Sequence, residues 1–261
     1  MIPVTAGPAP DFTAPRLRSV LRRVRTSLGD RADDPLSIMT LSDALTALGD
    51  NGVTDQGLCT IPVEQIVGTV GRTGEFDRQF RPLHAQSRDR WQRVAQAAAA
   101  GIELPPVDVI LLGEMYFVRD GHHRVSVARA LGRPTVAARV QRICTIAYAM
   151  GCLTLANLPS KAAERLFLER VPLPDDIRTD LWLDEPAQWL RLADAAEAWA
   201  FRNVLAGREL RDRGEFAHAW WTEEVVPVIE RLREAGEAVE LRDVQAYVTA
   251  LARRDRIGDP R

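Results

Sequence analysis

The chain has 261 residues, of which 46% are apolar, and a formal net charge of −2 at pH 7. This composition suffices for a full hydrophobic core, and the charge excludes a nucleic-acid-binding footprint that covers the whole molecule. No apolar stretch reaches the length of a membrane span and three cysteines do not make a disulfide framework, so we predict a cytoplasmic protein without a membrane partner.

The amino-terminal part predicts a flexible leader, Met1–Pro15, followed by an amphipathic basic helix. The apolar positions of that helix are Leu17, Val20, Leu21, Val24 and Leu28, and arginines 16, 18, 22, 23 and 25 lie among them. Such a helix either contacts phosphates of DNA or of a membrane surface, or packs on the domain with its arginines in solvent. A second helix is expected over Leu41–Leu48, before a turn-rich linker at residues 49–52.

A glycine-rich segment, Gly68–Pro82, predicts a long surface loop. It lacks the Gly-Lys-Ser/Thr ending of a Walker loop. Two interpretations stay open at this point. The loop is a plain connection, or it closes over a ligand with Arg72, Arg78 or Arg81 on the ligand's phosphates.

The next region predicts a hairpin, a helix and a strand in succession. Val107–Leu112 and the β-prone run 116–118 flank the turn residues Gly113 and Glu114. A helix is expected over Arg124–Leu131, and a further strand over Thr135–Val140. The sequence Asp-Gly-His-His-Arg, residues 120–124, therefore lies where a strand leads into a helix.

This junction carries the chemistry that the sequence offers. The first turn of a helix presents free backbone N–H groups and the positive end of the helix dipole, which together attract anions. Gly121 allows close approach, Arg124 offers a planar fork for phosphate oxygens, and His122 and His123 add donors. In the opposing interpretation Asp120 caps the helix, one histidine is a packing residue and Arg124 pairs with a carboxylate.

The segment Cys59–Val140 resembles the ParB/sulfiredoxin superfamily. The likeness rests on the strand and turn at 61–66, on the helix at 87–100 with the strand after it, and above all on 116–132. ParB proteins have a Gly-Glu-Arg-Arg box here and sulfiredoxins a Gly-Cys-His-Arg box, where this chain has Gly121-His122-His123-Arg124. Gly121 and Arg124 therefore carry over as phosphate-binding candidates. His122 stands in the place of the reactive cysteine, so the resemblance does not imply reductase activity.

A closer likeness is to uncharacterised bacterial ParB-like proteins that share the phrase at 116–124 and a similar second half. The resemblance implies a nucleoside triphosphate, CTP or ATP, with Mg²⁺, used as a switch or as a phosphoryl donor. Asp120 or His123 would then act as the catalytic base, and Asp120 or Glu114 would offer oxygen ligands to the nucleotide's Mg²⁺. A resident metal site is not expected, because adjacent histidines on a helix diverge by about 100°.

The alternative function is a DNA-binding transcriptional regulator or chromosome-partition-like protein, and a homodimer is an open expectation in either case. Residues beyond Arg142 are mostly helical in pattern, with a tryptophan-bearing stripe near 189–199, another stripe at 241–251, and a helix that Pro227 should kink. The predicted fold class is α+β. The expected domains are an arm at 1–57, a ParB/sulfiredoxin-like domain at 58–142 and a helical domain at 143–261.

Overall fold

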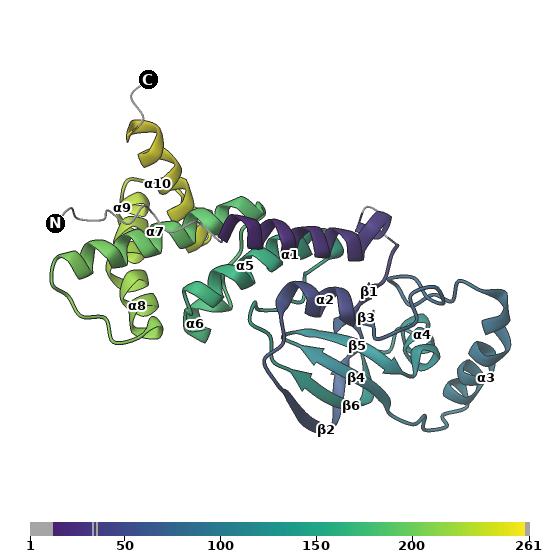
Figure 1. Ribbon diagram of the computed structural model, residues 1–261. Helices are drawn as coiled ribbons and strands as arrows, with labels where there is room; N and C mark the ends of the chain where they lie inside the picture. Colours follow the sequence, from purple (N-terminus) through teal and green to yellow (C-terminus); the bar gives the residue numbers. More distant parts are fainter. Residues whose placement is uncertain (1–12, 33, 35, 259–261) are drawn as a thin grey trace, which may run out of the picture.

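The computed structural model describes residues 13–258, apart from residues 33 and 35. It is a mixed α/β structure in which a six-stranded sheet carries helices on both faces and a helical part extends to one side (Figure 1). This confirms the α+β class and the helical carboxy-terminal part. None of the described helices is long and apolar enough to cross a membrane.

The sheet has the strand order β1-β3-β5-β4-β6-β2. Strands β1, β3 and β5 run parallel to one another, β4 is antiparallel to β5, and β6 is parallel to β4 and antiparallel to β2. The hairpin predicted at the glycine turn is the β4–β5 pair. The strands are β1 (Met39–Thr40), β2 (Val53–Pro62), β3 (Ile66–Thr69), β4 (Val107–Leu112), β5 (Met115–Asp120) and β6 (Thr135–Ile143).

The predicted helices are present, with small shifts at their ends. The helices are α1 (Thr13–Leu28), α2 (Leu41–Leu48), α3 (Arg88–Ala99), α4 (His122–Ala130), α5 (Leu158–Arg170), α6 (Asp175–Arg178), α7 (Pro186–Leu205), α8 (Arg213–Trp220), α9 (Val226–Glu234) and α10 (Asp243–Gly258). Helix α1 begins inside the expected leader. Pro15 is compatible with this start, because it falls in the first turn, where the backbone N–H has no partner within the helix. Residues 1–12 of that leader lie outside the described residues.

Each face of the sheet has its own hydrophobic layer. On the α4 side, Val109 and Val118 of the sheet pack with Val125 of the helix. On the other side, Leu112 and Phe117 belong to a larger cluster that continues through α2 and α5 into the helical part. Full burial of such side chains contributes about 1.5–3 kcal/mol each. The helical part therefore shares one core with the sheet, while α4 covers the opposite face and α3 packs beside α4 (Figure 1).

Two strands cross the domain boundaries expected at 57/58 and 142/143. Strand β2 starts at Val53, and β6 continues to Ile143, with which Val53 pairs. The short β1 also joins the sheet from within the expected arm. The sheet is thus wider than the sequence suggested, and the division into three domains stays a prediction.

The helical half follows its predicted stripes with one exception. Trp189, Leu192, Ala196 and Trp199 are buried on α7. Ahead of Pro227 the backbone forms a π-helical turn, Trp221–Val225, which agrees with the expected irregularity. Leu241 was expected in the last stripe, but α10 starts two residues later and leaves Leu241 37% exposed.

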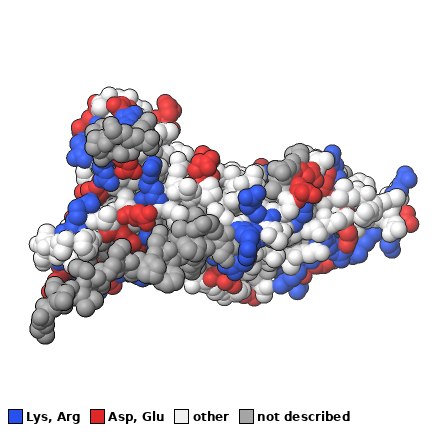
Figure 2. Space-filling model, turned by 45° about the horizontal axis from the view of Figure 1, so that its top comes forward, with Lys and Arg blue, Asp and Glu red and all other residues white. Residues whose placement is uncertain are grey.

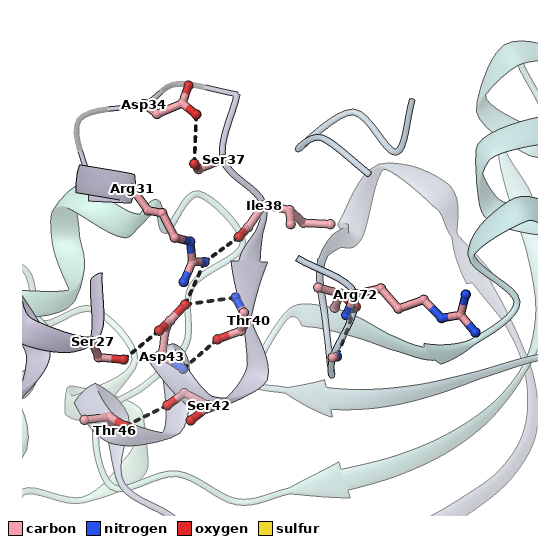
Figure 3. A network of polar contacts seen from close by, with 12 residues as sticks. Ser27, Arg31, Asp34, Ser37, Ile38, Thr40, Ser42, Asp43, Thr46 and Arg72 are labelled. Carbon is pink, nitrogen blue, oxygen red and sulfur yellow. Dashed lines mark hydrogen bonds and ion pairs between the residues drawn. The ribbon is translucent and has the colours of Figure 1, made fainter. Parts of the chain in front are cut away.

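The arm is fixed to the sheet by the buried carboxylate of Asp43 at the start of α2. Asp43 accepts hydrogen bonds from Ser27 (2.8 Å), Arg31 (2.9 Å) and the backbone N–H of Thr40 (3.2 Å). The Thr40 hydroxyl in turn accepts from the Asp43 N–H, which completes a capping box. Figure 3 shows these side chains converging on Asp43, so α1, β1 and α2 meet in one polar network.

Candidate functional site

The site is built where β5 passes into α4 through Gly121. This residue has φ 97° and ψ 20°, a left-handed conformation that glycine adopts without a steric penalty. A Cβ at this position would also lie 2.6 Å from Cγ1 of Val107. Both constraints require glycine, and they let the backbone turn directly from the strand into the helix.

The first turn of α4 has no side-chain cap. The helix is nine residues long, and its first backbone hydrogen bond joins the N–H of Val125 to the carbonyl of Gly121 (3.0 Å). The N–H groups of His122, His123 and Arg124 precede that bond. Among the described residues they have no hydrogen-bond partner, so they are donors available at the positive end of the helix dipole. Asp120 does not cap the helix, so this part of the packing interpretation is wrong.

His122 is a buried residue, 3% exposed, held from two sides. Its Nε2 lies 2.8 Å from Oγ1 of Thr69 at the end of β3, and its ring stacks on Phe76 with centroids 5.4 Å apart. Burial, reinforced by the charge of Arg72, lowers the pKa of His122 to about 4. The imidazole is therefore neutral at physiological pH.

His123 is 7% exposed and meets the edge of the same phenylalanine, Phe76, at 5.2 Å. Its Nδ1 is buried and has no hydrogen-bond partner among the described residues. Burial lowers the pKa of His123, and the charges of Arg90 and Arg72 lower it further. A buried unpaired ring nitrogen next to free helix N–H groups is unusual, because such atoms normally find a partner.

Arg124 is bound mainly within the protein. Nη1 donates to the carbonyls of Pro105 (2.7 Å) and Pro106 (2.6 Å), and Nη2 donates to the carboxylate of Asp120 (2.6 Å). The pairing with a carboxylate fits the packing interpretation. The remaining nitrogen, Nε, lies on the side of Gly121, 3.0 Å from where a Cβ would be. The guanidinium thus clamps the segment before β4 against α4.

A cavity of about 130 Å³ lies over the first turn of α4. Two arginines line it besides Arg124: Arg72 from the glycine-rich loop, which pairs with Glu75 (2.9 Å), and Arg90 from α3. The structure gives Arg90 no ion-pair partner among the described residues. The lining residues are Arg72, Arg90, Val94, Leu104, Pro105, Asp120, Gly121, His122, His123 and Arg124.

Sequence reasoning missed Arg90. The helix that carries it was expected, and Arg90 precedes Val94 by four residues, so both lie on one face of α3. Nothing local shows that this face turns toward α4. That orientation depends on contacts between the helices, such as the hydrogen bond from Trp91 to Ser126 (2.9 Å).

The glycine-rich loop brings one of its three arginines to the cavity. Arg78 and Arg81 are exposed and do not line it. Arg81 instead pairs with Asp77 (2.7 Å), whose carboxylate also accepts two backbone N–H groups of the loop. Buried phenylalanines, Phe76 and Phe80, anchor the loop beside His122. The loop is a fixed connection that positions Arg72.

The two oxygen ligands proposed for a nucleotide's Mg²⁺ lie apart. Asp120 ends β5, whereas Glu114 precedes its first residue and accepts hydrogen bonds from Tyr148 and the N–H of Gly151. Six residues of strand separate them, roughly 20 Å. Only Asp120 lies at the cavity. Within the described part of the chain, no three metal-ligating side chains come together.

Among the solved structures that resemble this chain are two of low similarity. A sulfiredoxin from Arabidopsis thaliana aligns with 33% of this chain and 86% of its own, at 20% identity and a TM-score of 0.25. A Pnob8-like ParB-N domain aligns with 81% of this chain and 87% of its own, at 12% identity and a TM-score of 0.23. No protein-family model and no curated protein matches. Similarity at this level transfers no ligand or activity, so the function must be argued from the site itself.

Proposed function

We propose that this protein is a ParB-like nucleotide-binding protein that holds a phosphate of CTP or ATP, with Mg²⁺, over the first turn of α4. The observation that carries the proposal is the uncapped helix start of Gly121, His122 and His123, beside the buried unpaired Nδ1 of His123. Free N–H donors, the helix dipole and two nearby arginines all favour an anion at the same point. A phosphoryl group supplies the acceptor oxygens that these donors lack.

The size of the cavity supports a phosphate and not a whole nucleotide inside it. At about 130 Å³ it is smaller than the roughly 300–1,000 Å³ of sites that enclose a drug-sized ligand. One phosphoryl group would occupy it, and the rest of the nucleotide would extend beyond. Arg72 and Arg90 would neutralise its charge, while Arg124 would act mainly through Nε and by keeping the site in shape.

The same site could serve as a switch or as a phosphoryl donor. For transfer, His123 has the required property of being neutral near pH 7, so it can accept a proton from an attacking hydroxyl. Asp120 is half exposed and already accepts from Arg124, which favours a role in holding Mg²⁺. Turnover assays on Asp120→Asn and His123→Ala distinguish the two uses, since unchanged turnover in both variants rules out catalysis by these groups.

Thermal unfolding with CTP, ATP, ADP and GTP, each with and without Mg²⁺, tests the binding proposal. A ligand at about 100 times its Kd adds roughly 2.7 kcal/mol to the free energy of unfolding. We expect a nucleotide-specific rise in Tm for the wild type that Arg90→Ala weakens. Arg93→Ala is the matched control, because Arg93 is exposed on the same helix and does not line the cavity. No rise with any nucleotide would refute the proposal.

DNA binding is the second candidate, favoured by the exposed side chains of Arg22, Arg23 and Arg25 on α1. Figure 2 shows basic and acidic side chains interspersed over the visible face, without one broad basic field. DNA affinity would therefore rest on a local patch and would fall steeply with added salt. A triple Arg→Ala variant of these positions that still bound DNA as tightly as the wild type would exclude α1 as the contact.

A further inference from the structure

The hydroxyl of Thr69 joins the glycine-rich loop to the first turn of α4. Thr69 ends β3 and is fully buried. Its Oγ1 accepts hydrogen bonds from the backbone N–H groups of Gly71 (3.3 Å) and Arg72 (3.1 Å), and lies 2.8 Å from Nε2 of His122. Figure 3 shows the side chain of Arg72 directed away from the Asp43 network. One hydroxyl thus touches both parts of the proposed phosphate site.

The proton count at Thr69 decides the direction of the bond to His122. A hydroxyl has two lone pairs and one hydrogen. The N–H groups of Gly71 and Arg72 occupy the lone pairs, so the hydrogen remains to be donated. Nε2 of His122 is the nearer acceptor at 2.8 Å, while the carbonyl of Val118 is 3.5 Å away. Nε2 therefore accepts, and it carries no proton.

A neutral imidazole without a proton on Nε2 must carry it on Nδ1. Burial against Phe76 and Phe80 disfavours the charged ring, and Arg72 and His123 add to this, while Glu75 and Asp120 oppose it. Nδ1 of His122 makes no hydrogen bond with the described residues and, unlike Nδ1 of His123, is not a buried unpaired atom. His122 lines the cavity, and Nδ1 is its ring nitrogen without a partner among the described residues.

We propose that Thr69 is a positioning residue that fixes His122 as the Nδ1-protonated tautomer, so that the ring presents an N–H donor to a doubly ionised phosphoryl group. This inference rests on the proposed function. The site would then bind the phosphate dianion through the hydrogen bond from His122 and the permanent charges of Arg72 and Arg90. A positively charged histidine would not be needed. The same hydroxyl aims Arg72 by holding its backbone N–H.

The tautomer is measured directly by NMR of ring nitrogens in protein labelled with ¹⁵N-histidine. The chain has four histidines, and the His122 signals are assigned by their loss in His122→Gln. We expect Nδ1 to be the protonated nitrogen of His122 in the wild type and in Thr69→Ser, which keeps the hydroxyl. Thr69→Val removes the donor and should shift the proton toward Nε2. A wild-type ring protonated on Nε2 overturns the proposal even if Thr69→Val does not fold.

The pH dependence of ligand affinity gives a second readout, with methyl phosphate as the probe. Its second ionisation lies near pH 6. With His122 neutral, affinity should rise as pH increases from 5.5 to 7.5, and Thr69→Val should lose roughly tenfold in affinity while Thr69→Ser stays within about twofold. Affinity that falls over this range would show binding by a charged histidine and would overturn the proposal.

The ring spectrum and the phosphate affinity distinguish a failure of the proposed function from a failure of the role given to Thr69. If neither methyl phosphate nor a magnesium nucleotide binds the wild type, the proposed function fails, and the ring spectrum alone then decides whether Thr69 fixes the tautomer. If phosphate binds but the tautomer is the same in wild type and folded Thr69→Val, the function stands and the role of Thr69 is refuted.

Discussion

Helices α2 and α4 begin at the same end of the sheet, because each directly follows one of two strands, β1 and β5, that run parallel to the β3 strand between them. At α2, the Thr40 hydroxyl and the Asp43 carboxylate form a capping box, with Arg31 as counter-charge (Figure 3). At α4, Gly121 offers no side chain, and the residues around the helix start are histidines and arginines.

The difference shows how a helix start becomes a binding site. Every helix leaves N–H groups without partners in its first turn, and a protein carboxylate or hydroxyl usually satisfies them. The α2 start is closed in this way and has no use for a ligand. The α4 start has the same dipole but no protein anion in the capping position. Arg72 and Arg90 line the cavity beside it, and the nearby carboxylate of Asp120 pairs with Arg124. In the proposed function an external anion completes it.

Removing the Asp43 carboxylate from the start of α2 should have the largest effect on stability. Asp43→Ala deletes the capping box and leaves Arg31 without its carboxylate, so we expect a loss of about 3 kcal/mol in the free energy of unfolding, measured by chemical denaturation. Ser42→Ala, on the same turn but exposed, should change stability by less than about 0.5 kcal/mol. Equal effects of the two substitutions would contradict the importance of this cap.

The neutral His122 predicts a loss of stability in acid. Its pKa is about 4 in the folded protein and 6.5 for a histidine in an unfolded chain, so the unfolded chain binds the proton more tightly. The stabilisation linked to neutral His122 should be fully present above pH 6.5. The free energy of unfolding should then fall by up to about 3 kcal/mol as pH drops to 4. Denaturation midpoints at each pH measure this.

The test compares wild type with His122→Asn, whose stability should lack that part of the pH dependence. Because both proteins contain the same other titratable groups, the difference between their pH profiles isolates His122. One such group is Glu164. Burial raises the pKa of Glu164 to about 7, so its protonation adds stability as pH falls. His84→Ala is the control at an exposed histidine. Identical pH profiles for wild type and His122→Asn would mean that His122 is not held neutral.

The two glycines at the ends of α4 give a matched pair. Gly121→Ala places a Cβ 2.6 Å from Val107 and also strains a left-handed backbone, so we expect a loss of about 2 kcal/mol and weaker phosphate binding. Gly132→Ala has the same kind of backbone, φ 62°, but open space around the new Cβ, and should cost about 1 kcal/mol with binding unchanged. Thermal unfolding and ligand titration of both variants would show whether the close packing of Val107 against Gly121 affects stability and phosphate binding.

The smallest effect should come from the charges around the α4 start. Removing one charged donor to a phosphate, as in Arg90→Ala, should weaken nucleotide affinity by roughly tenfold, with little change in stability because Arg90 is exposed. Isothermal titration of Arg90→Ala and Arg93→Ala measures this. If both variants lost affinity equally, general surface charge and not the cavity would explain the binding.

The elements of this fold follow from local sequence, whereas much of the site does not. Alternating and helical spacing predicted α2 and the β4–β5 hairpin, and the turn chemistry of Gly113 predicted where β4 ends. Gly121, His122 and His123 were expected at a helix start because their order in the chain suffices to put them there.

The long-range partners could not be read from the sequence. Thr69 lies 53 residues before His122, and the carbonyls that hold Arg124 lie 18 and 19 residues before it. Such pairings depend on how strands align and which helix face turns inward. The same holds for Arg78 and Arg81, which share a loop with Arg72 but point elsewhere because Asp77 and two phenylalanines fix the loop.

The most direct test of an open α4 start and a closed α2 start is an amide NMR titration of the ¹⁵N-labelled protein with MgCTP and MgATP. We predict saturable shifts of the His122, His123 and Arg124 amides with at least one nucleotide, while the amides of Leu41, Ser42 and Asp43 stay in place. Unmoved α4 amides with both nucleotides, or equal shifts at the two helix starts, would contradict the account.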